Sequence, residues 1–207
     1  MDDRLELTVA DLRRGATYPW LTSVVVPRPI AWVSSLSADG VRNLAPHSFF
    51  TVASAEPPIV SFTSVRTKDS LRNIRATGEF VVNLATRELA EQVNRTGTDF
   101  PPEVDELQLA GLTPAPSVLV APPRVAESPV ALECVFAGEH TFTEDGRGST
   151  VVFGRVVHLS VSRRTIADDG LPDIHALHPA ARLGRDQWSA IGEVFELARL
   201  PYEATGP

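Results

Sequence analysis

Two segments have the composition of long β-strands, 130–142 and 150–162, and only a short stretch lies between them. That stretch contains Asp145-Gly146, a pair that is typical of a tight hairpin turn. The two segments therefore predict the longest antiparallel hairpin of the chain, and a fold that is built mainly from β-structure.

Four shorter apolar segments indicate further strands, and they are 30–36, 41–52, 59–64 and 79–85. Asp39-Gly40 predicts a tight turn between the first two of them. Pro46 predicts a break in the second strand, or an edge or a bulge of the sheet, because proline cannot donate to a strand ladder.

Two short helices are expected between the strands. Segment 67–78 places Leu71 and Ile74 at helical spacing and ends at Gly78, a typical helix-terminating residue. A second helix is predicted over 86–94. Strands with two short inserted helices favour a closed or split β-barrel, and we expect a single domain over residues 1–207.

Composition excludes several classes of partner. The chain has 207 residues and a formal net charge of −7, and an acidic surface gives no support to a nucleic-acid partner. Its N-terminus lacks the apolar core of a signal peptide, and no apolar run has the length that a bilayer requires. We expect a cytoplasmic protein with no membrane partner. Cys134 is the single cysteine, so no intrachain disulfide forms.

Common catalytic and binding motifs are absent from the sequence. No Gly-x-Gly-x-x-Gly fingerprint opens a helix, no Walker-type Gly-Lys-Ser occurs, and no Gly-x-Ser-x-Gly elbow is present. His175 and His178 lack the second pair or the cysteines that would complete a metal site, so no metal is expected. Cys134 lies in an apolar run, which is typical of a buried, unreactive thiol.

The segment 64–70 runs from the end of a strand into the start of a helix, where backbone N–H groups and the helix dipole favour an anion. Positive side chains and hydroxyl groups accompany them, which predicts a cradle for one phosphate group. The same residues are also typical of a plain capped helix with solvated charges. The residues concerned are Ser64, Arg66, Thr67, Lys68 and Ser70.

The strand pair expected over 31–52 is a second candidate site. Small polar residues and aromatic residues alternate along it, and such a surface could hold the edge and the face of a flat heteroaromatic ligand. An ordinary strand pair with a polar outer face would have the same composition. The residues concerned are Trp32, Ser34, Ser35, Asn43, Ser48, Phe49 and Phe50.

Five motifs follow one another between residues 18 and 200. They are Pro-Arg-Pro-Ile-Ala-Trp-Val-Ser-Ser (27–35), Asn-Leu-Ala-Pro-His-Ser-Phe-Phe (43–50), Pro-Pro-Ile-Val-Ser-Phe (57–62), Lys-Asp-Ser (68–70) with Thr-Gly-Glu-Phe-Val-Val-Asn-Leu (77–84), and Arg-Leu-Gly (182–184) with Gly-Glu-Val-Phe (192–195). In this order they resemble the flavin reductase-like family of the flavoredoxin type. The resemblance implies an FMN-binding split β-barrel, usually a homodimer with the flavin near the subunit interface.

The resemblance also implies which residues bind the flavin and its phosphate. They are Ser34, Ser35, Asn43, Ala45, Pro46, Ser48, Phe49, Ser61, Thr63, Ser64, Arg66, Thr67, Lys68, Asp69 and Ser70. Two positions depart from the family pattern. His47 stands where an aromatic residue is frequent, and Trp188 stands where the closing motif tends towards tyrosine. His47 is a candidate catalytic residue or an ordinary histidine of the core or surface, and Trp188 is a candidate substrate contact.

The implied activity is that of an FMN-dependent oxidoreductase. NAD(P)H would deliver hydride to flavin N5, and the reduced flavin would pass electrons to a monooxygenase or another acceptor protein. Backbone amides around 45–48 are candidates to stabilise the reduced flavin. One phosphate cradle favours FMN, with FAD as the alternative flavin. A non-catalytic FMN-binding electron carrier or redox sensor, and an enzyme that uses bound FMN on a small organic substrate, both stay open.

Overall fold

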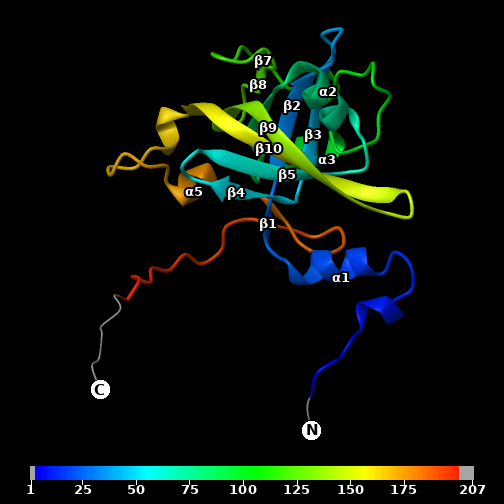
Figure 1. Ribbon diagram of the computed structural model, residues 1–207. Coiled ribbons are helices and arrows are strands. Elements are labelled where there is room, and N and C mark those ends of the chain that lie inside the picture. The colour runs from blue at the N-terminus through cyan, green and yellow to red at the C-terminus, as the bar shows by residue number, and fades with distance from the viewer. Residues whose placement is uncertain (1–2, 201–207) are drawn as a thin grey trace.

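The computed structural model describes residues 3–200, and its main body is a seven-stranded antiparallel sheet (Figure 1). The seven strands are β2 (Ala31–Leu36), β3 (Arg42–His47), β4 (Phe50–Ser54), β5 (Ile59–Val65), β6 (Glu79–Leu84), β9 (Val130–Glu144) and β10 (Arg147–Val161). Their order across the sheet is β3-β2-β6-β9-β10-β5-β4. The mainly β prediction is therefore confirmed.

The sheet curls until its two edges approach each other. The edge strands β3 and β4 are consecutive in sequence and are separated only by Ser48 and Phe49. The amide of Thr63 on β5 donates to the carbonyl of Phe49 at 2.9 Å, which holds this connection against the sheet. The result is an incompletely closed barrel.

The long hairpin of β9 and β10 is present as predicted. Its turn consists of Asp145 and Gly146, whose φ angles of 50° and 71° both lie in the left-handed region. Two such residues in succession form the turn that best matches the twist of paired strands, and Asp-Gly tolerates it well.

Short helices and strands complete the fold. The helices are α1 (Thr17–Val24), α2 (Asp69–Thr77), α3 (Ala90–Arg95), α4 (Glu106–Leu109) and α5 (Ile174–Leu177), with 3-10 turns at Val9–Asp11 and Arg163–Thr165. The two-residue strands are β1 (Arg28–Pro29), β7 (Pro114–Ala115), β8 (Arg124–Val125), β11 (Ala181–Arg182) and β12 (Trp188–Ser189). They form the small sheets β1-β11-β12 and β7-β8.

Two sequence predictions need correction. The expected strand 41–52 is interrupted at Ser48 and Phe49 and is not broken at Pro46. The edge position that Pro46 predicted is confirmed, because β3 is an edge strand of the sheet and a proline is tolerated there. The helix expected over 86–94 begins only at Ala90. Thr86 forms a β-bridge with Pro179, which keeps the chain extended at that point.

The helix predicted over 67–78 is confirmed as α2, and Gly78 ends it with a φ of 76°. Leu71 and Ile74 on this helix are fully buried against Ala31 and Val33 of β2. The intervening Trp32 is equally buried but belongs to a second apolar cluster with α3 and α4. Successive side chains of β2 therefore pack into two different apolar clusters. The contact of Leu71 and Ile74 with one face of β2 holds the start of α2 beside β3.

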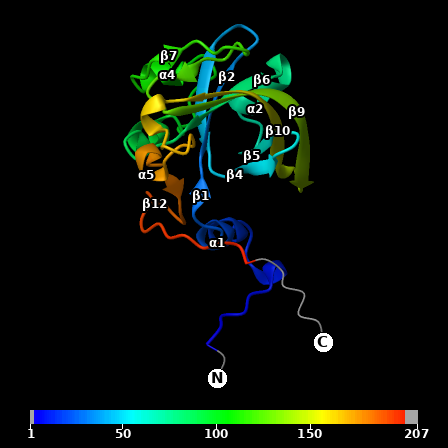
Figure 2. The ribbon, with the colours of Figure 1, turned by 90° about the vertical axis from the view of Figure 1, so that its left-hand side faces the viewer.

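Helix α1 lies below the barrel, and the N-terminal and C-terminal segments extend away on that same side (Figures 1 and 2). Within residues 3–200, no helix is long and apolar enough to cross a membrane.

Candidate functional site

A cavity of about 440 Å³ opens between β3, the start of α2 and the segment 96–100. This volume lies within the usual range for small-molecule sites. The sequence-predicted residues that line it are Asn43, Ala45, Pro46, His47, Ser48, Phe49, Thr63, Arg66, Thr67, Lys68, Asp69 and Ser70. The structure thus brings together residues from both candidate segments, the strand pair and the start of the helix.

The start of α2 is shaped by the loop before it. Arg66 has a φ of 68°, and the hydroxyl of Ser64 donates to its carbonyl at 2.8 Å, which stabilises the turn into the helix. Lys68 is the N-cap residue, and within the described residues its side chain makes no capping hydrogen bond. The first amides of α2 therefore meet the cavity without a capping side chain from Lys68, as an anion site requires.

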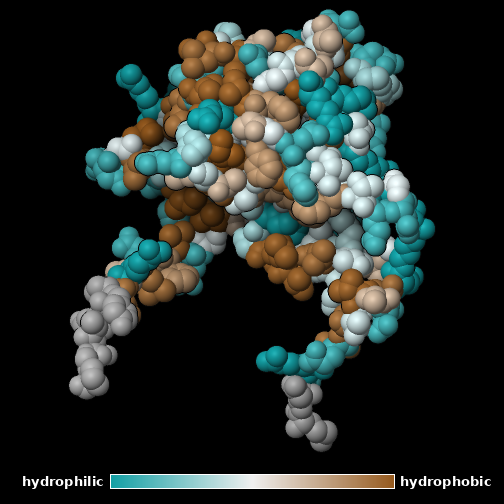
Figure 3. All heavy atoms as spheres, viewed as in Figure 1, coloured by the Kyte–Doolittle hydropathy of each residue, from teal (hydrophilic) through white to brown (hydrophobic). Residues whose placement is uncertain are grey.

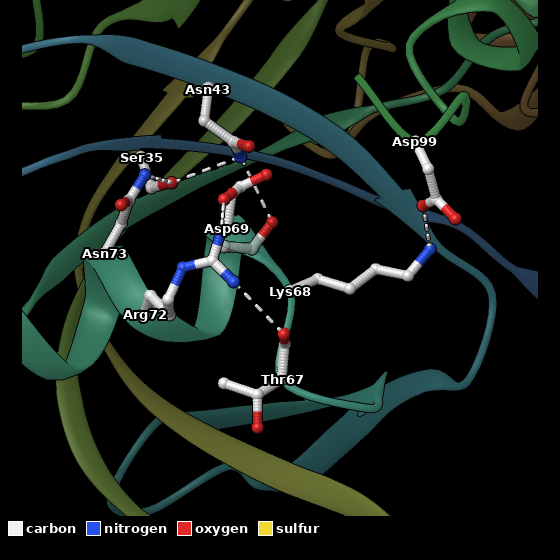
Figure 4. Close-up of polar contacts among 9 residues, drawn as sticks. Ser35, Asn43, Thr67, Lys68, Asp69, Arg72, Asn73 and Asp99 are labelled. Carbon is white, nitrogen blue, oxygen red and sulfur yellow. Dashed lines mark hydrogen bonds and ion pairs between the residues drawn. The ribbon is translucent and has the colours of Figure 1, made fainter. Parts of the chain in front are cut away.

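Figure 4 shows how the charged side chains lie at this helix start. Lys68 extends away from α2, and its Nζ lies 2.6 Å from Oδ1 of Asp99. Arg72 turns back along the helix, where it pairs with Asp69 and donates to the carbonyl of Thr67 at 3.2 Å. The cavity therefore has a mixed charge at this wall and not a uniformly positive one.

His47 lies in the wall of the cavity and is 8% exposed. Its Nε2 is 3.2 Å from the hydroxyl of Ser70, and its ring centroid is 4.6 Å from that of Phe62. Burial lowers the pKa of His47 to about 4, against a hydrogen bond to the Thr63 backbone that acts in the opposite direction, while the charge of Lys68 lowers it further. His47 is therefore neutral near pH 7.

A polar network supports Ser70 from behind the cavity wall. The amide group of Asn43 donates to Ser70 at 3.1 Å and to Ser35 at 3.3 Å, and Asn73 donates to Ser35 at 3.2 Å. Ser35 is fully buried, so it orients Asn43 and α2 and lies outside the cavity lining.

Six other predicted residues lie outside this lining. Trp32 is fully buried in the core, and Phe50 packs against the core. Ser34 is fully buried and donates to the carbonyl of Pro123, and Ser64 supports Arg66 as described. Ser61 pairs with Phe153 and Thr51 in the sheet. Trp188 lies on β12 beside another pocket, with the guanidinium of Arg182 4.9 Å above its ring.

The structure adds residues that the sequence did not indicate. They are Tyr18, Val65, Arg72, Thr96, Gly97, Thr98, Asp99, Phe100 and Glu106. Glu106 is buried and accepts a hydrogen bond from the amide of Leu44 at 3.0 Å, and burial raises its pKa. No motif marks the added residues between 96 and 106, because segment 96–123 has only the composition of a loop.

The lining fits one molecule of FMN. The positively charged side chains of the lining, Arg66, Lys68 and Arg72, all come from one short segment, which suits a single phosphate group. Pro46 and Phe49 also line the cavity, and they offer apolar cover for a flat ring system.

His175, His178 and Cys134 lie outside the cavity lining. His178 lies 2.5 Å from the carboxylate of Glu88, and within residues 3–200 no group of three or more potential ligands could hold a metal ion. Cys134 is buried in the core, and its burial, with the charge of Glu133, raises the pKa of the thiol to about 12. The prediction of a buried thiol is confirmed.

Comparisons with known proteins identify the family of the chain. A family model described as Flavin reductase like domain matches residues 21–171. An uncharacterized protein of Halalkalibacterium halodurans is 38% identical over 204 residues, which cover 94% of this chain and 96% of that protein.

Solved structures share the fold. Nitrilotriacetate monooxygenase component B from Bacillus cereus has a TM-score of 0.91 at 32% identity, over 95% of this chain and 100% of that one. A Shewanella frigidimarina protein with a split barrel domain has a TM-score of 0.80 at 24% identity, over 94% and 96% of the two chains. The predicted split-barrel fold is confirmed.

Proposed function

The chain belongs to the flavin reductase-like family, and from that membership we propose that it is an NAD(P)H:flavin reductase that uses FMN and passes electrons to a partner. The observation that carries the proposal is the set of cations at the start of α2, in the lining of a cavity that also presents the apolar side chains of Pro46 and Phe49. The resemblance to a protein named component B of a monooxygenase supports a monooxygenase as the partner.

Flavin binding would rest on the cations and on the apolar side chains of the cavity lining. Arg66 and Lys68, with the first amides of α2, would hold the phosphate, while Pro46 and Phe49 would cover the ring system and exclude water. The flavin supplies the redox chemistry, since it accepts hydride at N5. The single set of cations favours FMN, and FAD is the alternative flavin.

Hydrogen bonding along β3 selects a candidate donor to the reduced flavin. The amide of Leu44 donates to Glu106, away from β2, so alternation directs the amide of Ala45 towards β2. Pro46 has no amide hydrogen. Ser48 follows the end of β3, and we assign its amide as the donor that stabilises negative charge on the flavin.

His47 would act as a neutral group in this site. Its low pKa keeps the ring uncharged near pH 7, so it can position Ser70 and the flavin edge without adding a positive charge. We propose that the chain functions in the cytoplasm as a homodimer and forms one domain over residues 1–207, whose two ends lie outside the described residues.

The first test is a visible spectrum of the purified protein with added FMN, followed by anaerobic NADH or NADPH. We expect flavin binding and bleaching of the flavin absorbance by one of the nucleotides. Flavin binding without bleaching would favour an electron carrier or redox sensor. A protein that neither binds nor reduces FMN would refute the proposal.

Lys68→Gln tests the phosphate wall separately. We expect it to raise the dissociation constant of FMN about tenfold and to leave that of riboflavin nearly unchanged, because only FMN carries the phosphate. Arg75→Gln is the matched control, since Arg75 lies on the same helix but outside the cavity lining. Equal effects of Lys68→Gln on both flavins would contradict this placement of the phosphate.

A further inference from the structure

The cations that face the proposed phosphate site share a carboxylate that comes from another part of the chain. Lys68 Nζ lies 2.6 Å from Oδ1 of Asp99, although residue 99 is 31 positions away in sequence (Figure 4). The hydrogen bond from Lys68 and the charge of Lys68 lower the pKa of Asp99, against an opposing effect of burial. The charge of Arg66 lowers this pKa further, by less than either effect of Lys68. Asp99 is thus an ionised group within the field of both cations.

The segment that carries Asp99 is anchored at its start by Thr96 and Gly97. Thr96 is 2% exposed, and its hydroxyl accepts a hydrogen bond from the indole of Trp32 at 2.9 Å. Gly97 packs so closely on β3 that an added Cβ would lie 3.3 Å from Cγ of Pro46. Since Trp32 is fully buried in the core, residues 96 and 97 hold the segment in place beside the cavity.

Asp99 itself is free to leave this contact. Its side chain is 77% exposed, and that of Lys68 is 44% exposed, so water can solvate either group when the pair separates. An exposed pair of this kind contributes little to folding stability. Asp99 lies in the cavity lining, and we therefore expect it to affect ligand binding more than folding stability.

We propose that Asp99 is an internal counter-ion of the phosphate site, which the phosphate of the flavin must displace from Lys68 and Arg66 before it binds. This inference rests on the proposed function. An incoming phosphate meets cations that are already partly neutralised, and the nearby carboxylate repels it. Asp99 therefore weakens FMN binding and speeds FMN release. Such a site suits a flavin that exchanges between the reductase and its partner better than one that is held permanently.

The test compares Asp99→Asn with Glu139→Gln. Glu139 also forms an ion pair, with Arg75, and lies outside the cavity lining, so its variant controls for the loss of one negative charge. We would measure the dissociation constants of FMN and riboflavin by flavin fluorescence, and the FMN dissociation rate by stopped flow. We expect Asp99→Asn to bind FMN about three- to tenfold more tightly, mainly through slower release, with riboflavin changed by less than about twofold.

A double variant shows whether the effect runs through the cation. In a Lys68→Gln background, the gain from Asp99→Asn should shrink, because only Arg66 then remains for Asp99 to neutralise. Asp99→Ser should reproduce the gain of Asp99→Asn, and unchanged riboflavin binding shows that each variant is folded.

The outcomes separate this inference from the proposed function. Unchanged FMN affinity in Asp99→Asn, or an equal change for riboflavin, overturns the role of Asp99 and leaves the flavin site standing. Weaker FMN binding in Asp99→Asn overturns it as well. If the unsubstituted protein binds neither flavin, the proposed function falls, and the inference falls with it.

Discussion

His47 shows how one buried side chain couples the cavity to stability. The ring is 8% exposed, it contacts Ser70 and Phe62, and burial lowers its pKa from 6.5 to about 4. In the unfolded chain the same histidine would titrate near its ordinary pKa. Between pH 6.5 and about pH 4, His47 is therefore protonated in the unfolded state and neutral in the folded state.

We therefore expect His47 to destabilise the fold as the pH falls. Its contribution is fully favourable above pH 6.5 and is lost progressively between pH 6.5 and pH 4, by up to about 3 kcal/mol. Urea unfolding of the wild type and of His47→Gln across this range measures it. The free energy of unfolding of the wild type should fall more steeply than that of His47→Gln. Parallel curves would show that His47 titrates normally in the folded state.

At the scale of elements, strand β10 contains a glycine at a position where a side chain would not fit. Gly154 lies at an irregularity in the pairing of β9 and β10, and an added Cβ would lie only 2.2 Å from Cζ of Phe80. Phe80 is fully buried and packs edge-on against Phe62, at a centroid distance of 5.6 Å. The ring has little space into which it could move.

Gly154→Ala should therefore destabilise the protein by about 1–3 kcal/mol through overpacking. Gly192→Ala is the matched control, because its Cβ would meet nothing within 4 Å and its backbone is not left-handed. Urea unfolding at pH 7 measures both variants. A Gly154→Ala protein as stable as Gly192→Ala would mean that the barrel interior can relax around Phe80.

The sequence predicts local features of these elements better than distant ones. The turn at Asp145-Gly146 and the end of α2 at Gly78 follow from residue types that adopt a left-handed backbone, so they were predictable. The start of α3 was not, because it depends on the bridge between Thr86 and Pro179. The periodicity of a sequence does not predict a contact between residues that lie so far apart in the chain.

Among the residues of the candidate site, too, the sequence predicts those that depend on local structure and misses those that depend on distant contacts. Arg66 and Lys68 were predictable because a strand end and a helix start adjoin in sequence. Asp99 was not, because the hydrogen bond that holds its segment joins Trp32 to Thr96, which are 64 positions apart. Ser35 was expected beside the flavin and instead lies behind Asn43, since strand alternation alone does not tell which face meets the cavity.

At the scale of the whole molecule, α1 and the C-terminal segment expose several large apolar side chains. Figure 3 shows hydrophobic surface on the α1 side, below the barrel. The exposed residues there are Tyr18, Trp20, Leu21, Val24, Val25, Val194, Phe195 and Leu197. Apolar patches of this kind mark interaction surfaces. Tyr18 also lines the cavity, so whatever covers α1 lies next to the proposed flavin site.

We expect a second copy of the chain to cover this surface, and the homodimer should depend on Leu21. Leu21 is 54% exposed on α1, and Leu21→Asp would place an unpaired charge in the interface, which should raise the dimer dissociation constant at least about tenfold. Leu171→Asp is the control, because Leu171 is 65% exposed but lies outside α1 and the C-terminal segment. Light scattering at micromolar concentration should find dimers of the wild type and of Leu171→Asp, with monomers of Leu21→Asp. Because Tyr18 links α1 to the cavity, the monomeric variant should also bind FMN more weakly. A wild-type protein that is monomeric at this concentration would contradict the dimer, and α1 would then need another partner to cover it.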